Sequence, residues 1–150
     1  MKTGQKGFTL IELLVVIAII STLATVVFVA LDPVKRFTDS RNSRRTGDVQ
    51  TILTAVHSYI VDNGGSMPAG VGLTETQIGT AASGCATLCT GAAAACSDLS
   101  TPLVKYLKSL PTDPQSGSAA TTGYSIVRDA NNIITVKACS AEGVTISVSR

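Results

Sequence analysis

The sequence contains no tryptophan and a single histidine, His57. No recognisable motif offers this histidine a nucleophile or a second metal ligand, so we expect it to be a helix-surface or packing residue. The many serines and threonines lack an adjacent base in a nucleophile motif, and no glycine-rich phosphate loop precedes a helical pattern. The sequence therefore predicts no enzyme, no cofactor and no metal site.

Charged residues are almost missing from one long stretch near the N-terminus. From Phe8 to Leu31 nearly every residue is apolar, and Glu12 carries the only ionisable side chain. A helix of this length spans about 36 Å, which is enough to cross a hydrocarbon core of about 30 Å. The small-residue site of an ordinary secretory signal is also missing between Ser21 and Asp32. We therefore expect residues 8–31 to span a membrane at some stage.

Glu12 is the unusual feature of this apolar stretch. A carboxylate at the bilayer centre costs roughly 2.5–3.5 kcal/mol, and less toward an interface. Two interpretations follow from this cost. Either Glu12 lies near the lipid headgroups and stays hydrated, or it finds a cationic partner in an assembly.

The residues around Glu12 resemble a known signature. Lys6-Gly7-Phe8-Thr9-Leu10-Ile11-Glu12 and the apolar run after it, to about Ala24, resemble the N-terminus of type IV prepilins and type II secretion pseudopilins. The resemblance implies that a membrane aspartyl peptidase cuts after Gly7 and methylates Phe8. It also implies that Glu12 pairs with the N-terminal amine of a neighbouring subunit. Residues 1–7 would then be a leader peptide, and residues 8–31 a transmembrane helix that later forms a filament core.

Basic residues give two opposing signals about orientation. Lys2 and Lys6 favour a cytoplasmic N-terminus, which places the rest of the chain outside the cytoplasm. A second basic cluster beyond the apolar run argues weakly the other way: Lys35, Arg36, Arg41, Arg44 and Arg45. Acidic residues are interleaved with it, and the resemblance favours an extracytoplasmic head. We therefore predict that the head is extracytoplasmic.

The same cluster, from Lys35 to Asp48, permits three interpretations. It is typical of a solvated helix face, in which Arg44 and Asp48 form a helical neighbour pair. It could instead form ion pairs between subunits where the helix leaves the membrane. Nucleic acid is a further candidate partner, but Phe37 is the only aromatic residue interleaved with the cluster.

Residues 32–63 are expected to form an amphipathic helix. Asp32 and Pro33 predict either the start of a second helix or a kink in one long helix. Val49, Ile52, Leu53, Val56 and Ile60 then follow helical spacing, which predicts one buried stripe. The run from Asp62 to Gly65 predicts the helix end, because asparagine and glycine adopt the left-handed conformation that stops a helix.

Residues 64–150 are expected to form a small globular head. About a hundred residues poor in aromatics bury only a modest core, so cross-links would help. The spacing of the four cysteines matches no zinc pattern, and an extracytoplasmic head favours disulfides: Cys85, Cys89, Cys96 and Cys139. Four cysteines allow three pairings, and the sequence does not decide among them. We favour Cys85–Cys96 with Cys89–Cys139, because Cys139 needs a partner in the loop.

The sequence of the rest of the head predicts mainly strands. Residues 66–95 read as an irregular loop, with a short turn around residues 74–78, and Thr101 and Pro102 predict a short helix through Leu107. Three strands follow, at residues 124–128, 133–138 and 144–148, each rich in β-branched residues. The predicted fold is α+β and pilin-like. A long N-terminal helix, apolar first and amphipathic later, packs on a small C-terminal three-stranded antiparallel sheet. We carry no calcium site over from pseudopilins, because only Asp129 and Glu142 are acidic near the last strands.

The resemblance implies a structural role. The chain would be a subunit of a type IV pilus that polymerises through its apolar helix, serving adhesion, motility or DNA uptake. Its partners would be other copies of itself, the prepilin peptidase and methyltransferase, and the assembly platform with its ATPase. It would lie in the inner membrane as a precursor and then in the pilus on the cell surface. A pseudopilin or minor pilin of a secretion or competence system is the first alternative, and a membrane-anchored binding module that never polymerises is the second.

Overall fold

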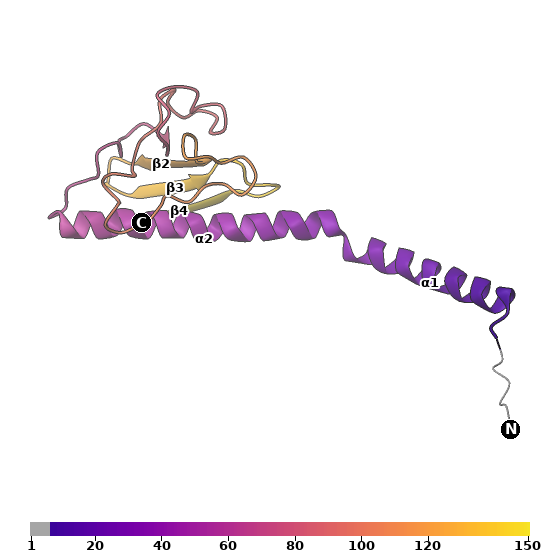
Figure 1. Cartoon of the computed structure of the whole chain (residues 1–150). Helices are drawn as coiled ribbons and strands as arrows, with labels where there is room; N and C mark the ends of the chain where they lie inside the picture. Colours follow the sequence, from indigo (N-terminus) through magenta and orange to yellow (C-terminus); the bar gives the residue numbers. More distant parts are fainter. Residues whose placement is uncertain (1–6) are drawn as a thin grey trace. The chain divides into compact units, whose positions relative to one another are not determined.

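The computed structural model describes residues 7–150, and Figure 1 shows their helices and strands coloured by position in the sequence. These residues form two helices and a four-stranded sheet. The chain divides into two compact units, one up to Phe37 and one from Thr38 onward. The leader predicted at residues 1–7 lies outside the described residues except for Gly7.

The first helix, α1, comprises Leu10–Leu31, and none of its residues is buried. The hydroxyl groups of its three serine and threonine side chains all form hydrogen bonds within the helix. Ser21, Thr22 and Thr25 each donate to the carbonyl four residues earlier, at 2.7–2.9 Å. By length and composition, the described chain has one helical stretch apolar enough to cross a membrane, and α1 is its apolar part. At about 1.5 Å per residue, α1 alone is about 33 Å long.

A second helix begins after Asp32, so the first of the two alternatives predicted for this position is observed. Asp32 adopts a left-handed conformation with φ of 39°, and α2 comprises Pro33–Asp62. Pro33 has no backbone N–H to continue the α1 hydrogen bonds. The Asp32 side chain caps the new helix, because its Oδ1 accepts from the Lys35 N–H at 3.3 Å.

The α2 helix is amphipathic and ends where the sequence predicted. Its buried positions are Arg45, Val49, Ile52, Leu53, Ala55 and Val56. At the C-terminal end, Gly64 and Gly65 have positive φ angles of 62° and 90°. The Gly65 N–H donates to the Ile60 carbonyl at 2.8 Å, which closes the last turn.

The sheet has one strand more than the three that the sequence predicted. Its order is β1-β2-β3-β4, and all neighbours are antiparallel. The extra strand, β1 (Thr76–Gln77), pairs with β2 (Tyr124–Arg128). The remaining strands are β3 (Ile134–Ala138) and β4 (Ile146–Ser149), so β3 begins one residue and β4 two residues later than expected. The strand β1 lies in the segment expected to be irregular.

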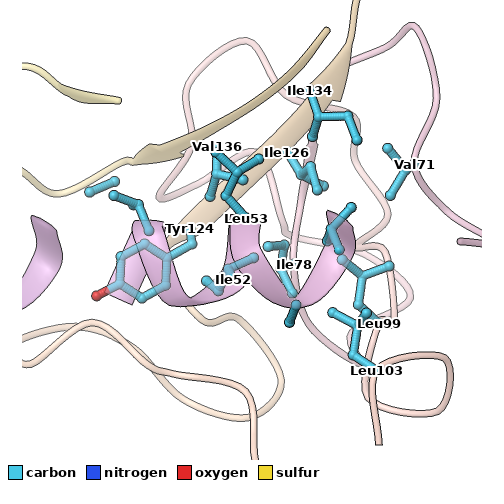
Figure 2. Packing of buried hydrophobic residues seen from close by; sticks show 14 of the residues in the cluster. Ile52, Leu53, Val71, Ile78, Leu99, Leu103, Tyr124, Ile126, Ile134 and Val136 are labelled. Carbon is cyan, nitrogen blue, oxygen red and sulfur yellow. The ribbon is translucent and has the colours of Figure 1, made fainter. Parts of the chain in front are cut away.

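The hydrophobic core lies between the sheet and the apolar stripe of α2 (Figure 2). Ile52 and Leu53 of α2 are buried together with side chains from β2 and β3 and from the loops: Ile78, Leu99, Leu103, Tyr124, Ile126, Ile134 and Val136. The α+β fold class predicted from the sequence is therefore confirmed. The short helix expected at residues 101–107 does not form, because this segment consists of turns.

Two disulfides link the head, and their pairing is the one that we favoured. Cys85 pairs with Cys96, eleven residues away, and Cys89 pairs with Cys139, fifty residues away. The second disulfide joins the loop to the residue that follows β3. It therefore connects two segments far apart in the sequence, whereas the first closes a local loop.

Candidate functional site

The first part of the candidate site is the stretch from Gly7 to Thr9, before α1 begins. These residues are outside regular secondary structure, and Phe8 is 90% exposed. A side chain added at Gly7 would meet no atom within 4 Å. The peptide bond between Gly7 and Phe8 is therefore free of contacts that would hinder a protease within the described chain.

Glu12 takes part in a capping box at the start of α1. The Thr9 backbone N–H donates to Glu12 Oε2 at 2.8 Å, and the Thr9 hydroxyl donates to the same oxygen at 2.9 Å. In return, the Glu12 N–H donates to Thr9 Oγ1 at 3.3 Å. This reciprocal arrangement satisfies two N–H groups that an uncapped helix end would leave unpaired. It holds the carboxylate beside the backbone of Thr9, the residue that follows Phe8.

The surroundings of Glu12 are otherwise apolar. Phe8, Ile11, Val15 and Val16 line a shallow hollow on the helix surface next to the carboxylate. Within residues 7–150, Glu12 Oε1 has no hydrogen-bond partner, so this oxygen remains available to a donor from another molecule. A carboxylate on an apolar surface that becomes buried requires such a partner.

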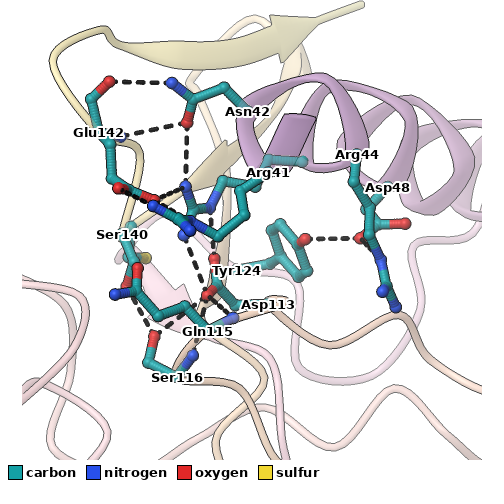
Figure 3. Close-up of polar contacts among 12 residues, drawn as sticks. Arg41, Asn42, Arg44, Asp48, Asp113, Gln115, Ser116, Tyr124, Ser140 and Glu142 are labelled. Carbon is teal, nitrogen blue, oxygen red and sulfur yellow. Dashed lines mark hydrogen bonds and ion pairs between the residues drawn. The ribbon is translucent and has the colours of Figure 1, made fainter. Parts of the chain in front are cut away.

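The second part of the candidate site is a polar network that attaches α2 to the C-terminal half of the head (Figure 3). At its centre is Arg45, whose side chain is fully buried. Arg45 Nε donates to Asp113 Oδ2 at 2.6 Å, and Nη2 donates to Asp113 Oδ1 at 3.2 Å. Nη1 donates to Asn42 Oδ1 and to Glu142 Oε1, both at 2.9 Å. All three guanidinium nitrogens therefore have an acceptor.

Asp113 organises the loop before β2. Its Oδ1 also accepts from the backbone N–H groups of Gln115 and Ser116, at 2.9 and 3.0 Å. Gly117 packs so closely that an added Cβ would lie 2.3 Å from the Asp113 nitrogen. Burial alone would raise the pKa of Asp113, but the hydrogen bonds from Arg45 and from these two N–H groups outweigh it and lower the pKa.

Glu142, in the turn between β3 and β4, is attached to α2 by both side chain and backbone. Arg41 Nε donates to Glu142 Oε1 at 2.6 Å, and Asn42 Nδ2 donates to the Glu142 carbonyl at 2.9 Å. The hydrogen bonds from Arg41, and then those from Arg45, lower the pKa of Glu142 to about 2. The turn therefore carries a carboxylate that remains ionised well into the acidic range.

These contacts correct one expectation about the cluster from Lys35 to Asp48. Interpreting the whole cluster as a solvated helix face was wrong for Arg45, which is buried, and for Arg41, which pairs with Glu142. The expected neighbour pair of Arg44 and Asp48 is present at 3.8 Å, and Asp48 also accepts from the Tyr124 hydroxyl at 2.7 Å. Two of the five cations, Arg41 and Arg45, therefore pack against the head, whereas Lys35, Arg36 and Arg44 are exposed.

The ion pairs of Glu142 predict acid sensitivity of the head. Its pKa is lower in the folded chain than the ordinary value of 4.5, so the unfolded chain takes up the proton first. The stabilisation is complete above about pH 4.5 and is lost as the pH falls toward about 2. We expect the thermal unfolding midpoint of the head, followed by tyrosine near-UV circular dichroism, to decrease as the pH is lowered from about 4.5 to about 2.

A matched variant separates Glu142 from the other carboxylates. In Glu142→Gln the midpoint should be lower near neutral pH and should change less across the same window. An identical pH dependence in both proteins would contradict the assignment of this window to Glu142. Asp113 contributes in the same direction, because its pKa is also lowered.

The remaining residues singled out from the sequence do not join these two groups. The four cysteines form disulfides in the loop region and after β3. His57 is half-buried on α2. No group of three or more potential metal ligands occurs among the residues that the structure describes.

Comparison with known families identifies the N-terminal part of the candidate site. A family model described as the prokaryotic N-terminal methylation motif matches residues 2–28. No curated protein and no solved structure matches the chain. The resemblance on Lys6 to Ala24 is therefore confirmed, and the match extends across most of α1 but not into the head.

Proposed function

We propose that this chain, which carries the methylation signal of type IV prepilins and pseudopilins, is a structural subunit of a type IV pilus. The observation that supports this most directly is the combination of that signal with α1, whose residues are all exposed in the single chain. So many exposed apolar side chains require a bilayer or a bundle of like helices to cover them. The precursor has the bilayer, and the filament provides the bundle.

Processing prepares the N-terminus for assembly. A prepilin peptidase removes residues 1–7 by cutting after Gly7, and the new terminal amine at Phe8 is methylated. The exposure of Phe8 and the open surroundings of Gly7 suit this reaction. Methylation of the amine keeps its positive charge, so the mature chain carries a cation at Phe8 and an anion at Glu12.

These two charges set the axial register between subunits. The capping box holds Glu12 Oε2 against Thr9, while Oε1 remains available to a neighbour. In a core of apolar helices an unpaired charge costs several kcal/mol. A neighbouring subunit relieves that cost only when its terminal amine lies at the height of Glu12. The assembly platform and its ATPase would move each subunit out of the inner membrane into this register.

The alternative role as a pseudopilin or minor pilin rests on the same motif. In the described head, Glu142 is occupied by Arg41 and Arg45, and Asp129 accepts from the N–H groups of Asn131 and Ile133 in its own turn. Glu142 is therefore engaged by two guanidinium groups, and Asp129, whose two hydrogen bonds both involve Oδ1, offers a single carboxylate near the last strands of the described head. Together with the two disulfides, this favours an exposed pilus subunit.

The role of Glu12 is tested by two substitutions. Glu12→Gln keeps the side-chain length and the hydrogen bonds of a capping box but removes the charge. Glu12→Ala removes both. If the charge sets the register, both variants should insert into the membrane and lose their leader normally. The yield of filaments sheared from cells should fall about 100-fold, because the terminal amine of the neighbouring subunit would be a buried charge without a partner. Normal filament yield from Glu12→Gln would mean that Glu12 only caps the helix, and the register mechanism would be rejected.

A further inference from the structure

Two cations just beyond α1 have no ion-pair partner among the described residues. Of the five basic residues between Lys35 and Arg45, three pair with carboxylates: Arg41 with Glu142, Arg44 with Asp48, and Arg45 with Asp113 and Glu142. Lys35 and Arg36 are exposed and form no salt bridge within residues 7–150. Both belong to the first turn of α2.

This turn lies at a defined distance from the start of the apolar helix. Since α1 is about as long as a hydrocarbon core is thick, its C-terminal end at Leu31 reaches the far membrane surface. The first turn of α2 follows two residues later, and it belongs to the same compact unit as α1. Lys35 and Arg36 are therefore placed at the depth of the lipid headgroups.

The neighbours of the two cations suit the same location. Val34 and Phe37 flank them and are 73% and 66% exposed. Basic residues with an adjacent aromatic ring are typical of the membrane interface, where the ring lies among headgroups and the cations reach lipid phosphates.

Two carboxylates near the cations have other positions. Asp32 Oδ1 accepts from the Lys35 backbone N–H and so faces the start of α2, whose helix dipole favours a negative charge. Asp39 lies on α2 one turn beyond Lys35, farther along the chain from α1. Asp32 is nearer to α1 than the cations are, but its carboxylate is held at the start of α2, and Asp39 offsets part of the attraction of the cations for anionic lipid.

We propose that residues 34–37 form a lipid-interface anchor, in which Lys35 and Arg36 bind anionic phospholipid headgroups and Phe37 lies beside them in the interface. This anchor rests on the membrane stage of the proposed function. It holds the precursor at a fixed depth before assembly, and it is released when the subunit leaves the bilayer.

The absence of tryptophan provides a direct test. In the full chain, Phe37→Trp introduces a single fluorescent reporter at the interface. The chain is reconstituted in vesicles of equal parts phosphatidylcholine and phosphatidylglycerol, with bromine placed on the acyl chains of one lipid or the other. Bromine quenches the tryptophan, so the quenching by each lipid gives its relative binding constant around the reporter. We expect this constant to be about fivefold higher for phosphatidylglycerol than for phosphatidylcholine, as for one net cation at the surface.

Charge variants identify the residues responsible. Lys35→Gln with Arg36→Gln, in the same reporter background, should bring the ratio of the two binding constants to one or below, because Asp32 and Asp39 remain. The matched control removes two exposed cations of the head, Lys108→Gln with Arg150→Gln, and should leave the ratio unchanged. A ratio of one in the parent reporter, or an equal loss in both double variants, would overturn the anchor.

A second reporter separates this proposal from the one on which it rests. In Val26→Trp the fluorophore lies within α1, and bromines deep in the acyl chains should quench it if α1 spans the bilayer. Quenching at residue 26 without lipid selectivity at residue 37 would reject the anchor alone. No quenching at residue 26 would reject the membrane stage, and the anchor with it.

Discussion

Replacing Asp113 with asparagine is expected to destabilise the head by about 3–5 kcal/mol, the usual cost of removing one partner from a buried ion pair. Asp113 and Arg45 both have fully buried side chains, so the guanidinium would lose its main counter-charge without gaining water. The loop would also lose the charge-assisted hydrogen bonds that the Gln115 and Ser116 N–H groups donate to the Asp113 carboxylate.

An exposed ion pair of the same chemistry provides the control. Asp62 pairs with Lys105 at 2.7 Å, but their side chains are 43% and 72% exposed. Asp62→Asn should therefore cost less than about 1 kcal/mol. Both variants can be compared by urea unfolding of the full chain in detergent, followed by the near-UV signal of the three tyrosines, of which Tyr59 packs on the core from α2 and the other two lie in the head. Equal losses in the two variants would contradict the central role of the Arg45 network.

Removing the Cys89–Cys139 disulfide is expected to have the second large effect. It closes a loop of about fifty residues, for which the chain-entropy model gives a stabilisation of about 4 kcal/mol. The Cys85–Cys96 disulfide closes a loop of eleven residues, for which the same model gives about 3 kcal/mol. Cys89→Ala with Cys139→Ala should therefore lower the urea midpoint more than Cys85→Ala with Cys96→Ala.

The two double variants serve as controls for each other. Each removes two sulfurs, and in each pair one cysteine is a buried residue of the loop, Cys89 or Cys85. A larger loss from the short-range disulfide would mean that local order in the loop, and not closure of the long loop, stabilises the head.

The helices and most of the sheet could be predicted because their signals are local. The apolar run from Phe8 to Leu31 predicted α1, and the spacing of Val49, Ile52 and Val56 predicted the buried face of α2. β-branched runs separated by turns predicted β2, β3 and β4 within two residues.

The Arg45 network could be predicted only in part. Arg45 lies four residues before Val49, so extending the apolar stripe by one turn would have placed it on the buried face. Its partners Asp113 and Glu142 lie 68 and 97 residues away, and no local pattern connects residues so distant. The charge of Arg45 therefore suggested a solvated residue, although its position suggested a buried one.

Two smaller errors have the same cause, because distant contacts decided the local structure. The strand β1 has only two residues and exists because β2 pairs with one side of it and the Ser97 N–H donates to Gln77 on the other. The segment expected to be helical at residues 101–107 is held instead by the end of α2, since Lys105 and Tyr106 both donate to Asp62. Helix propensity did not decide the conformation there.

The central claim, that the chain is processed and assembled into a surface filament, is tested most directly by the intact mass of the protein sheared from cells. We expect a chain that begins at Phe8, heavier by one methyl group, and lighter before reduction by the four hydrogens lost in two disulfides. This result would establish cleavage, methylation, export and disulfide formation together. An empty sheared fraction, with a membrane-bound chain that still begins at Met1 or Lys2, would contradict the account and indicate an anchored module that does not polymerise.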